Sequence, residues 1–104
     1  MLGPVRHIVM WRLRGDTPED RDAARNRVKS AFEGLKGLID GLDHIEVGCD
    51  ISRVEYACDV VLVSEFRNAA ALKSYANHPE HLRVRDELGD LRIERRQVDY
   101  VVES

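Results

Sequence analysis

The chain has 104 residues, of which 43% are hydrophobic and 34% charged, and its formal net charge is −3 at pH 7. This length and mixture predict one globular domain over residues 1–104 rather than a disordered chain. The acidic balance argues against a nucleic-acid partner, because domains that bind nucleic acid are usually basic, and no apolar run reaches the roughly 18 residues that indicate a membrane span.

The first predicted element is a strand over residues 5–13. Alternation places His7 and Trp11 on one face of it, and Ile8 and Met10 on the other. Both faces carry apolar side chains, which predicts a strand that is covered on both sides. The N-terminus leads directly into this strand without the apolar core of a signal peptide, so we expect a cytoplasmic protein.

A helix is predicted next, beginning at Pro18 after a capping Thr17. Its apolar side chains follow a helical spacing from Ala24 to about Ile39, and Gly37 is a candidate for its C-terminal cap.

Two more strands are predicted over residues 41–51 and 56–66, joined by a turn at 52–55. The centre of the second, from Val60 to Val63, is apolar on both faces, as in a strand covered on both sides. The chain has two cysteines, Cys49 and Cys58, one on each side of this turn, and they could be neighbours across the two strands. In a reducing cytosol we expect both to be free thiols.

Two short helices are predicted over residues 69–76 and 79–88, because Pro79 cannot continue the first helix but suits the start of the second. A last strand is predicted over residues 91–102. The arginines fall in two segments mixed with Asp and Glu, which we interpret as solvated faces: Arg21, Arg25 and Arg27, and Arg92, Arg95 and Arg96.

The order β-α-β-β-α-β, with the second helix broken at residues 77–78, predicts an α+β, ferredoxin-like fold. Helices would cover one face of a four-stranded antiparallel sheet. The other face would expose an apolar patch: Ile8, Met10, Val61 and Val63. We therefore expect a homodimer that packs sheet against sheet as a dimeric α/β barrel.

A tyrosine and two histidines, spaced by three, lie between Tyr75 and His81, with His78 between them. His81 falls in the first turn of a helix, where the dipole favours the neutral imidazole and so a general base. Tyr75 could donate a hydrogen bond to a developing oxyanion. His7 lies on a strand face that can look toward the helices and meet this group.

Other interpretations of the same residues stay open. His78 could cap a helix, and Tyr75 could be a core residue. His7, His78 and His81 could supply three nitrogens to a metal, although no carboxylate or thiol is well spaced to join them. Trp11 beside a histidine pocket could stack on a ligand or a haem, yet no haem motif is present and no cofactor is predicted.

Four segments resemble the stress-responsive dimeric α/β-barrel (Dabb) family: residues 7–12, 41–48, 59–66 and 72–81, the last containing Tyr-x-x-His-Pro-x-His. Asp40 departs from the family, in which many members have Pro before Gly-Leu. The resemblance implies a dimer of ferredoxin-like units without implying one activity. The chain is more distantly similar to the plant polyketide cyclase olivetolic acid cyclase, which implies Tyr75 and His81 as a catalytic pair.

The leading hypothesis is a Dabb-type homodimer of undetermined biochemical role with a pocket for a small carbonyl or aromatic ligand. The predicted lining residues are His7, Val9, Trp11, Leu62 and His78. The first alternative is a cofactor-independent cyclase or lyase, in which His81 removes a proton and Tyr75 polarises a carbonyl. The second is a haem- or metal-binding barrel protein.

Overall fold

The computed structural model describes residues 3–103. Its elements, in chain order, are β1 (Val5–Leu13), α1 (Pro18–Glu33), β2 (Leu42–Cys49), β3 (Val60–Phe66), α2 (Ala69–Ala76), α3 (Pro79–Leu88) and β4 (Arg92–Val101). Met1, Leu2 and Ser104, which the single-domain prediction includes, lie outside the described residues.

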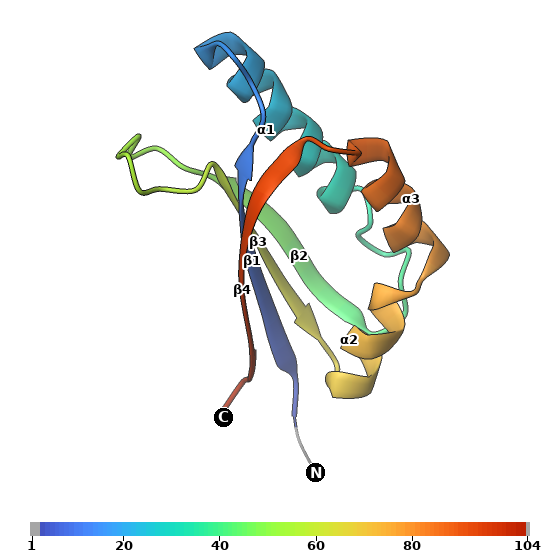
Figure 1. Cartoon of the computed structure of the whole chain (residues 1–104). Coiled ribbons are helices and arrows are strands. Elements are labelled where there is room, and N and C mark those ends of the chain that lie inside the picture. Colours follow the sequence, from blue (N-terminus) through green and yellow to red (C-terminus); the bar gives the residue numbers. More distant parts are fainter. Residues whose placement is uncertain (1–2, 104) are drawn as a thin grey trace.

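The strands form one antiparallel sheet in the order β2-β3-β1-β4, and the helices all lie on one side of it (Figure 1). The predicted ferredoxin-like fold class is confirmed, including the break between α2 and α3. None of the described helices covers the opposite side of the sheet, which we call the open face. None of them has the length and apolar character needed to cross a membrane.

The core lies between the sheet and the helices. Val9 of β1 and Leu62 of β3 are fully buried there, together with Val28 of α1. Trp11 stacks on Phe32 of α1 with ring centroids 5.3 Å apart. Each such side chain stabilises the fold by about 1.5–3 kcal/mol relative to an exposed position, so these contacts hold β1 and α1 in fixed relation.

Helix α1 begins as predicted but ends earlier. The Thr17 hydroxyl accepts a hydrogen bond from the Asp20 amide at 3.0 Å. The helix stops at Glu33, although Leu35 and Ile39 remain buried in the turns that follow. The predicted C-terminal cap at Gly37 is therefore wrong, since Gly34 caps the helix. The apolar spacing continues to Ile39 because those side chains stay buried after the helical hydrogen bonds have ended.

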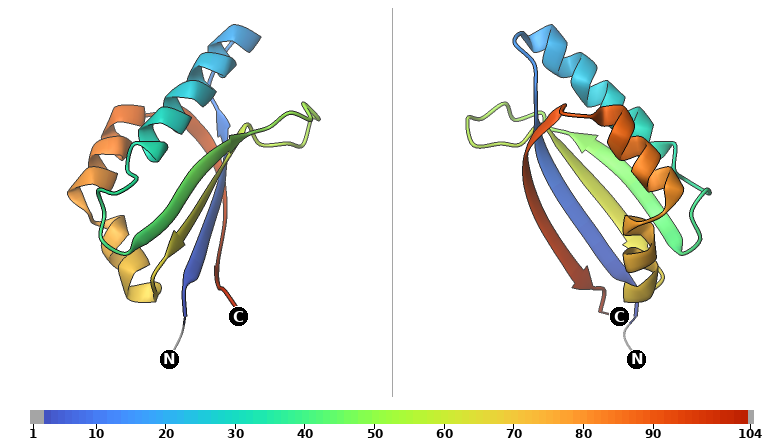
Figure 2. Two further views of the ribbon diagram at one scale, coloured as in Figure 1. Left: turned by 180° about the vertical axis from the view of Figure 1, so that it is seen from behind. Right: turned by 45° about the vertical axis from the view of Figure 1, so that its right-hand side comes forward.

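Strands β2 and β3 are shorter than predicted, and residues 50–59 form a loop in place of the expected tight turn. Ile51 and Tyr56 are 93% and 87% exposed, so their apolar character does not extend either strand. Figure 2 shows this loop projecting from the end of the sheet, away from the helices. The Asp50 carboxylate shapes the loop by accepting hydrogen bonds from Ser52 and Arg53.

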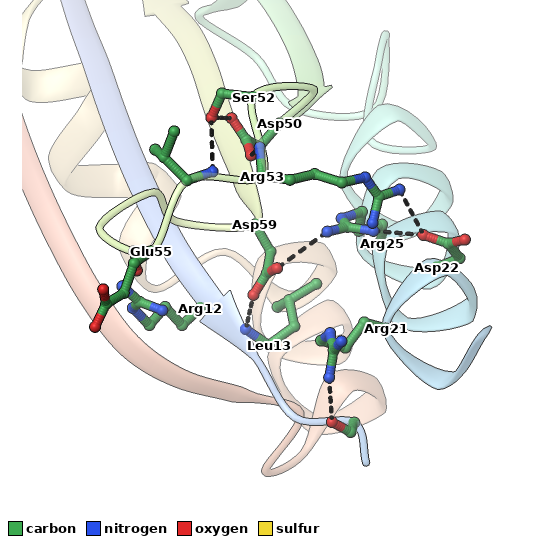
Figure 3. A network of polar contacts seen from close by, with 12 residues as sticks. Arg12, Leu13, Arg21, Asp22, Arg25, Asp50, Ser52, Arg53, Glu55 and Asp59 are labelled. Atoms are coloured by element: carbon green, nitrogen blue, oxygen red, sulfur yellow. Dashed lines mark hydrogen bonds and ion pairs between the residues drawn. The ribbon is translucent and has the colours of Figure 1, made fainter. Parts of the chain in front are cut away.

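A polar network fixes the far end of the loop (Figure 3). The Asp59 carboxylate accepts a hydrogen bond from the Leu13 amide at 2.7 Å and contacts the Arg25 guanidinium at 3.2 Å. Arg25 also pairs with Asp22 and is only 8% exposed. The interpretation of this arginine as part of a solvated face is therefore wrong, because Asp59 supplies a buried partner from a distant part of the chain.

Candidate functional site

The junction between α2 and α3 brings Tyr75 and His81 together. Asn77 ends α2 and Pro79 begins α3, so the chain turns between them. The two rings then lie with centroids 4.3 Å apart. Tyr75 is 3% exposed, and its hydroxyl oxygen is buried without a hydrogen-bond partner among residues 3–103.

His81 has a defined proton arrangement. Its Nδ1 lies 3.2 Å from the Ala76 carbonyl oxygen, which accepts only, so Nδ1 carries the proton and Nε2 of the neutral ring is free to accept one. Burial lowers the pKa of His81, and the positive charges of Arg92 and Arg85 lower it further against the opposing effect of that carbonyl. A neutral ring is what the helix position predicted, but burial is the main cause.

Tyr75 differs from His81 in that it keeps its proton. Burial raises the pKa of Tyr75 to about 12, while the positive charges of Arg92 and Arg95 act in the opposite direction. The phenol is therefore a hydrogen-bond donor at neutral pH. Beside it, the unprotonated Nε2 of His81 is an acceptor, and the pair matches the donor and acceptor needs of a carbonyl compound with an adjacent acidic proton.

His7 joins this group from β1. Its ring centroid lies 6.2 Å from that of Tyr75, and the side chain is buried. The His7 Nδ1 lies 2.5 Å from Asp99 Oδ1 on β4. The carboxylate accepts a hydrogen bond from the Nδ1–H of His7 and so fixes the orientation of the ring. Two histidines thus approach the Tyr75 ring from different elements.

Strand β4 supplies polar side chains at every second residue. Arg95 Nε donates to Gln97 Oε1 at 3.0 Å, and Gln97 Nε2 donates to Asp99 Oδ2 at 3.0 Å. Asp99 then contacts His7, so the row ends at the candidate site. Of these residues, the sequence pointed only to Arg95, as part of a predicted solvated face. Their alternation with Val98 and Tyr100 indicates that they share one face of the strand. No neighbouring residue in the sequence indicates a contact with His7.

Arg92 lies where β4 begins. Its guanidinium carbon is 4.9 Å from the Trp11 ring centroid and 5.7 Å from the Phe32 ring centroid. Arg92 is half-buried, so its interpretation as part of a solvated face is also wrong. A depression of about 260 Å³ opens beside it, lined by Trp11, Gly89 and residues 92–95.

His78 has a different environment. Its Nδ1 accepts a hydrogen bond from the Glu80 amide at 3.1 Å, which makes it the N-terminal cap of α3. It lines a hollow of about 300 Å³ together with Tyr75, Asp40 and Arg67. The other predicted lining residues, Val9 and Leu62, are packed in the core.

The open face carries the apolar patch that the sequence predicted. Met10 is 38% exposed, Val98 61% and Tyr100 42%, and Ile8 is half-buried among them. Val61 and Val63 of β3 extend the patch and are also half-buried. A hollow of about 660 Å³ lies at one end of it, beneath the loop 50–59.

The two cysteines have free thiols, and Cys49 lies opposite Val60 in the sheet rather than opposite Cys58. Within residues 3–103, no three His, Cys, Asp or Glu side chains come together as a metal-ligand set.

Comparisons with known proteins agree with this fold. The family model for the stress-responsive A/B barrel domain, Dabb, matches residues 5–102. A stress-response A/B barrel domain-containing protein of Arabidopsis thaliana is 31% identical over the whole chain, and the chain spans half the length of that relative. A dimeric, ferredoxin-like protein of unknown function from Bacteroides fragilis is 38% identical, with a TM-score of 0.84 over 96% of this chain and 97% of that one.

One similar structure belongs to an enzyme, a hydroxynitrile lyase from Passiflora edulis. It has a TM-score of 0.79 over 99% of this chain and 96% of that one, with 15% identity. At this identity the likeness concerns the fold alone.

Proposed function

The chain belongs to the stress-responsive A/B barrel (Dabb) family, and on this premise we propose that it binds a small carbonyl compound beside Tyr75, His81 and His7. The observation that carries the proposal is the buried Tyr75 hydroxyl without a partner among residues 3–103. An unsatisfied buried hydroxyl costs about 1–3 kcal/mol. A ligand oxygen that accepts its hydrogen bond would offset this cost.

The test is a thermal-shift and ligand-observed NMR screen of neutral ketones and aromatic aldehydes. We expect Tyr75→Phe to weaken the binding of a hit by about ten-fold, because it removes one buried hydrogen bond. Tyr56→Phe is the matched control, since Tyr56 is exposed in the loop 50–59. Equal binding by the wild type and both variants would contradict the assignment of the site, and the absence of any hit would contradict the function.

A second candidate function is proton transfer without a cofactor, and the unprotonated Nε2 of His81 is the observation that favours it. His81 would remove a proton next to the ligand carbonyl, and Tyr75 would donate a hydrogen bond to the oxygen as negative charge develops there. In deuterated buffer, we expect His81→Gln to abolish proton exchange in a bound ketone without abolishing binding. Exchange at the wild-type rate in this variant would exclude the role.

We also propose that the protein acts as a homodimer through its open face. The relative from Bacteroides fragilis is described as dimeric. Pairing two copies of this face would remove Met10, Val98 and Tyr100 from water. The candidate site lies on the other side of the sheet, so the partner copy would not cover it in such a dimer.

We propose a cytoplasmic location, which suits the free thiols of Cys49 and Cys58. Alkylation of intact cells before lysis is expected to modify both thiols without prior reduction. A disulfide recovered from the cells would argue against this location.

A further inference from the structure

We propose that the ligand of this site carries a carboxylate and that Arg92, supported by Arg95, binds it. The inference rests on the proposed function and narrows it from carbonyl compounds in general to small organic acids that contain a carbonyl group. Its main support is the environment of Arg92, which is half-buried against Trp11 and Phe32.

The Arg92 guanidinium has no carboxylate within ion-pair distance among residues 3–103, whereas Arg12 contacts Glu94 and Arg25 contacts Asp59, each at 3.2 Å. A charge that is partly withdrawn from water and has no counter-charge is unfavourable. Burial is also the main cause that lowers the pKa of Arg92. A bound anion would supply the missing counter-charge.

The contacts that Arg92 does make leave its N–H groups available. Trp11 and Phe32 lie against the guanidinium at 4.9 and 5.7 Å from its carbon to the ring centroids. Such stacking uses the face of the planar group and leaves its edge free for the two parallel hydrogen bonds that a carboxylate accepts. The aromatic rings therefore orient Arg92 without accepting hydrogen bonds from its N–H groups.

Arg95 places a second positive charge nearby. Its guanidinium carbon is 5.9 Å from the Trp11 centroid, and its side chain is bonded to Gln97 rather than to an acid. Glu94, which lies between the two arginines in sequence, is paired with Arg12. Two like charges against one indole disfavour each other, and an anion between them would relieve this repulsion.

A row of side-chain contacts along β4 connects this anion site to the candidate site. Arg95 donates to Gln97, Gln97 donates to Asp99, and Asp99 contacts His7, whose ring centroid lies 6.2 Å from that of Tyr75. The depression beside Arg92 measures about 260 Å³. Pockets for drug-sized ligands usually measure about 300–1,000 Å³, so this one suits a small acid whose carbonyl group extends toward Tyr75.

The experiment compares levulinate with levulinamide, a neutral analogue of the same shape that keeps the ketone. Binding to the full chain is measured by calorimetry and by protein-observed NMR at pH 7. We expect levulinate to bind at least about ten-fold more tightly, because the hydrogen bonds to Arg92 are charge-assisted. Arg92→Gln is expected to remove the preference for levulinate. Arg14→Gln is the control, since Arg14 is exposed and its guanidinium contacts Asp90.

The outcomes separate this inference from the proposed function. Equal binding of the two probes, or an undiminished preference in Arg92→Gln, would overturn the carboxylate assignment and leave the carbonyl site standing. If a neutral ketone binds and levulinate does not, the carboxylate assignment is likewise overturned and the carbonyl site stands. If neither probe nor any neutral ketone binds, both proposals fail. Arg92→Met, which keeps the apolar contact with Trp11, replaces the Gln variant should that variant not fold.

Discussion

Tyr75 is held almost entirely out of water, yet its hydroxyl oxygen has no partner among residues 3–103. The ring itself is well packed, with its centroid 4.9 Å from that of Phe66 and 4.3 Å from that of His81. The ring contacts stabilise the fold, and the hydroxyl does not. The ring of Tyr75 thus contributes to stability, and its hydroxyl is the part of the side chain to which we assign a function.

We predict that Tyr75→Phe raises the free energy of unfolding by about 1 kcal/mol, because it removes a buried hydroxyl that forms no hydrogen bond and keeps the ring. Urea unfolding of the wild type and the variant measures the change. A loss of 1 kcal/mol or more would mean that the hydroxyl has a stabilising partner in solution.

His81 predicts a pH dependence. Its pKa in the folded protein lies below the ordinary value of 6.5. The unfolded chain therefore binds a proton more readily, so the contribution of His81 to stability is complete above about pH 6.5 and falls as the pH drops below it.

We expect the unfolding free energy of His81→Gln to fall less between pH 7.5 and 5.5 than that of the wild type, and His44→Gln, at an exposed position of β2, serves as the control. NMR titration of the ring protons measures the His81 pKa directly. A value above 6.5 would contradict the effect of burial.

At the scale of elements, the junction between α2 and α3 has two functions that the motif alone does not distinguish. His78 caps α3 through the Glu80 amide, whereas His81, three residues later, lies against Tyr75. The proline between them separates the two helices and so separates the two roles. The structure assigns a structural role to His78.

Accordingly, His78→Ala is predicted to lower the free energy of unfolding by about 1 kcal/mol, as for the loss of other N-terminal caps. His78→Asn should restore most of this loss, because its side-chain oxygen also accepts from a backbone amide. Thermal unfolding of the three proteins tests this order. If His78→Asn is no more stable than His78→Ala, the cap does not contribute to stability.

At the scale of the whole molecule, the two sides of the sheet differ in what covers them. The helices cover one side, and the open face presents Met10, Val98 and Tyr100 to the surroundings (Figure 1). An apolar face of this kind on a small domain favours self-association. The proposed dimer would bury these apolar side chains, which a single copy leaves exposed.

The wild type is predicted to have about twice the single-chain mass of 11.9 kDa by light scattering at micromolar concentration. Val98→Glu should shift it to the mass of one chain, because it places a charge within the proposed interface. Leu38→Glu is the control, since Leu38 is also exposed but lies in the turn after α1. A single-chain mass for the wild type would rule out the dimer.

The order and type of the elements could be predicted from the sequence because their signals are local. Thr17, Asn68 and Pro79 mark helix starts within a few residues, and the structure confirms the bounds of α2 and α3. The alternation in β1 likewise predicted two apolar faces. The predicted end of α1 and the predicted start of β3 were wrong, because they depended on apolar spacing alone. Apolar spacing indicates which side chains are buried and not which backbone groups form hydrogen bonds.

Local residue patterns were sufficient to predict the fold class, the apolar open face and the grouping of Tyr75 with His81. The folded chain was needed to find that Asp99 contacts His7, that Asp59 pairs with Arg25, and that Arg92 is half-buried against Trp11. These contacts join residues far apart in the chain. Their geometry depends on strand register and packing, which no local pattern of residues encodes.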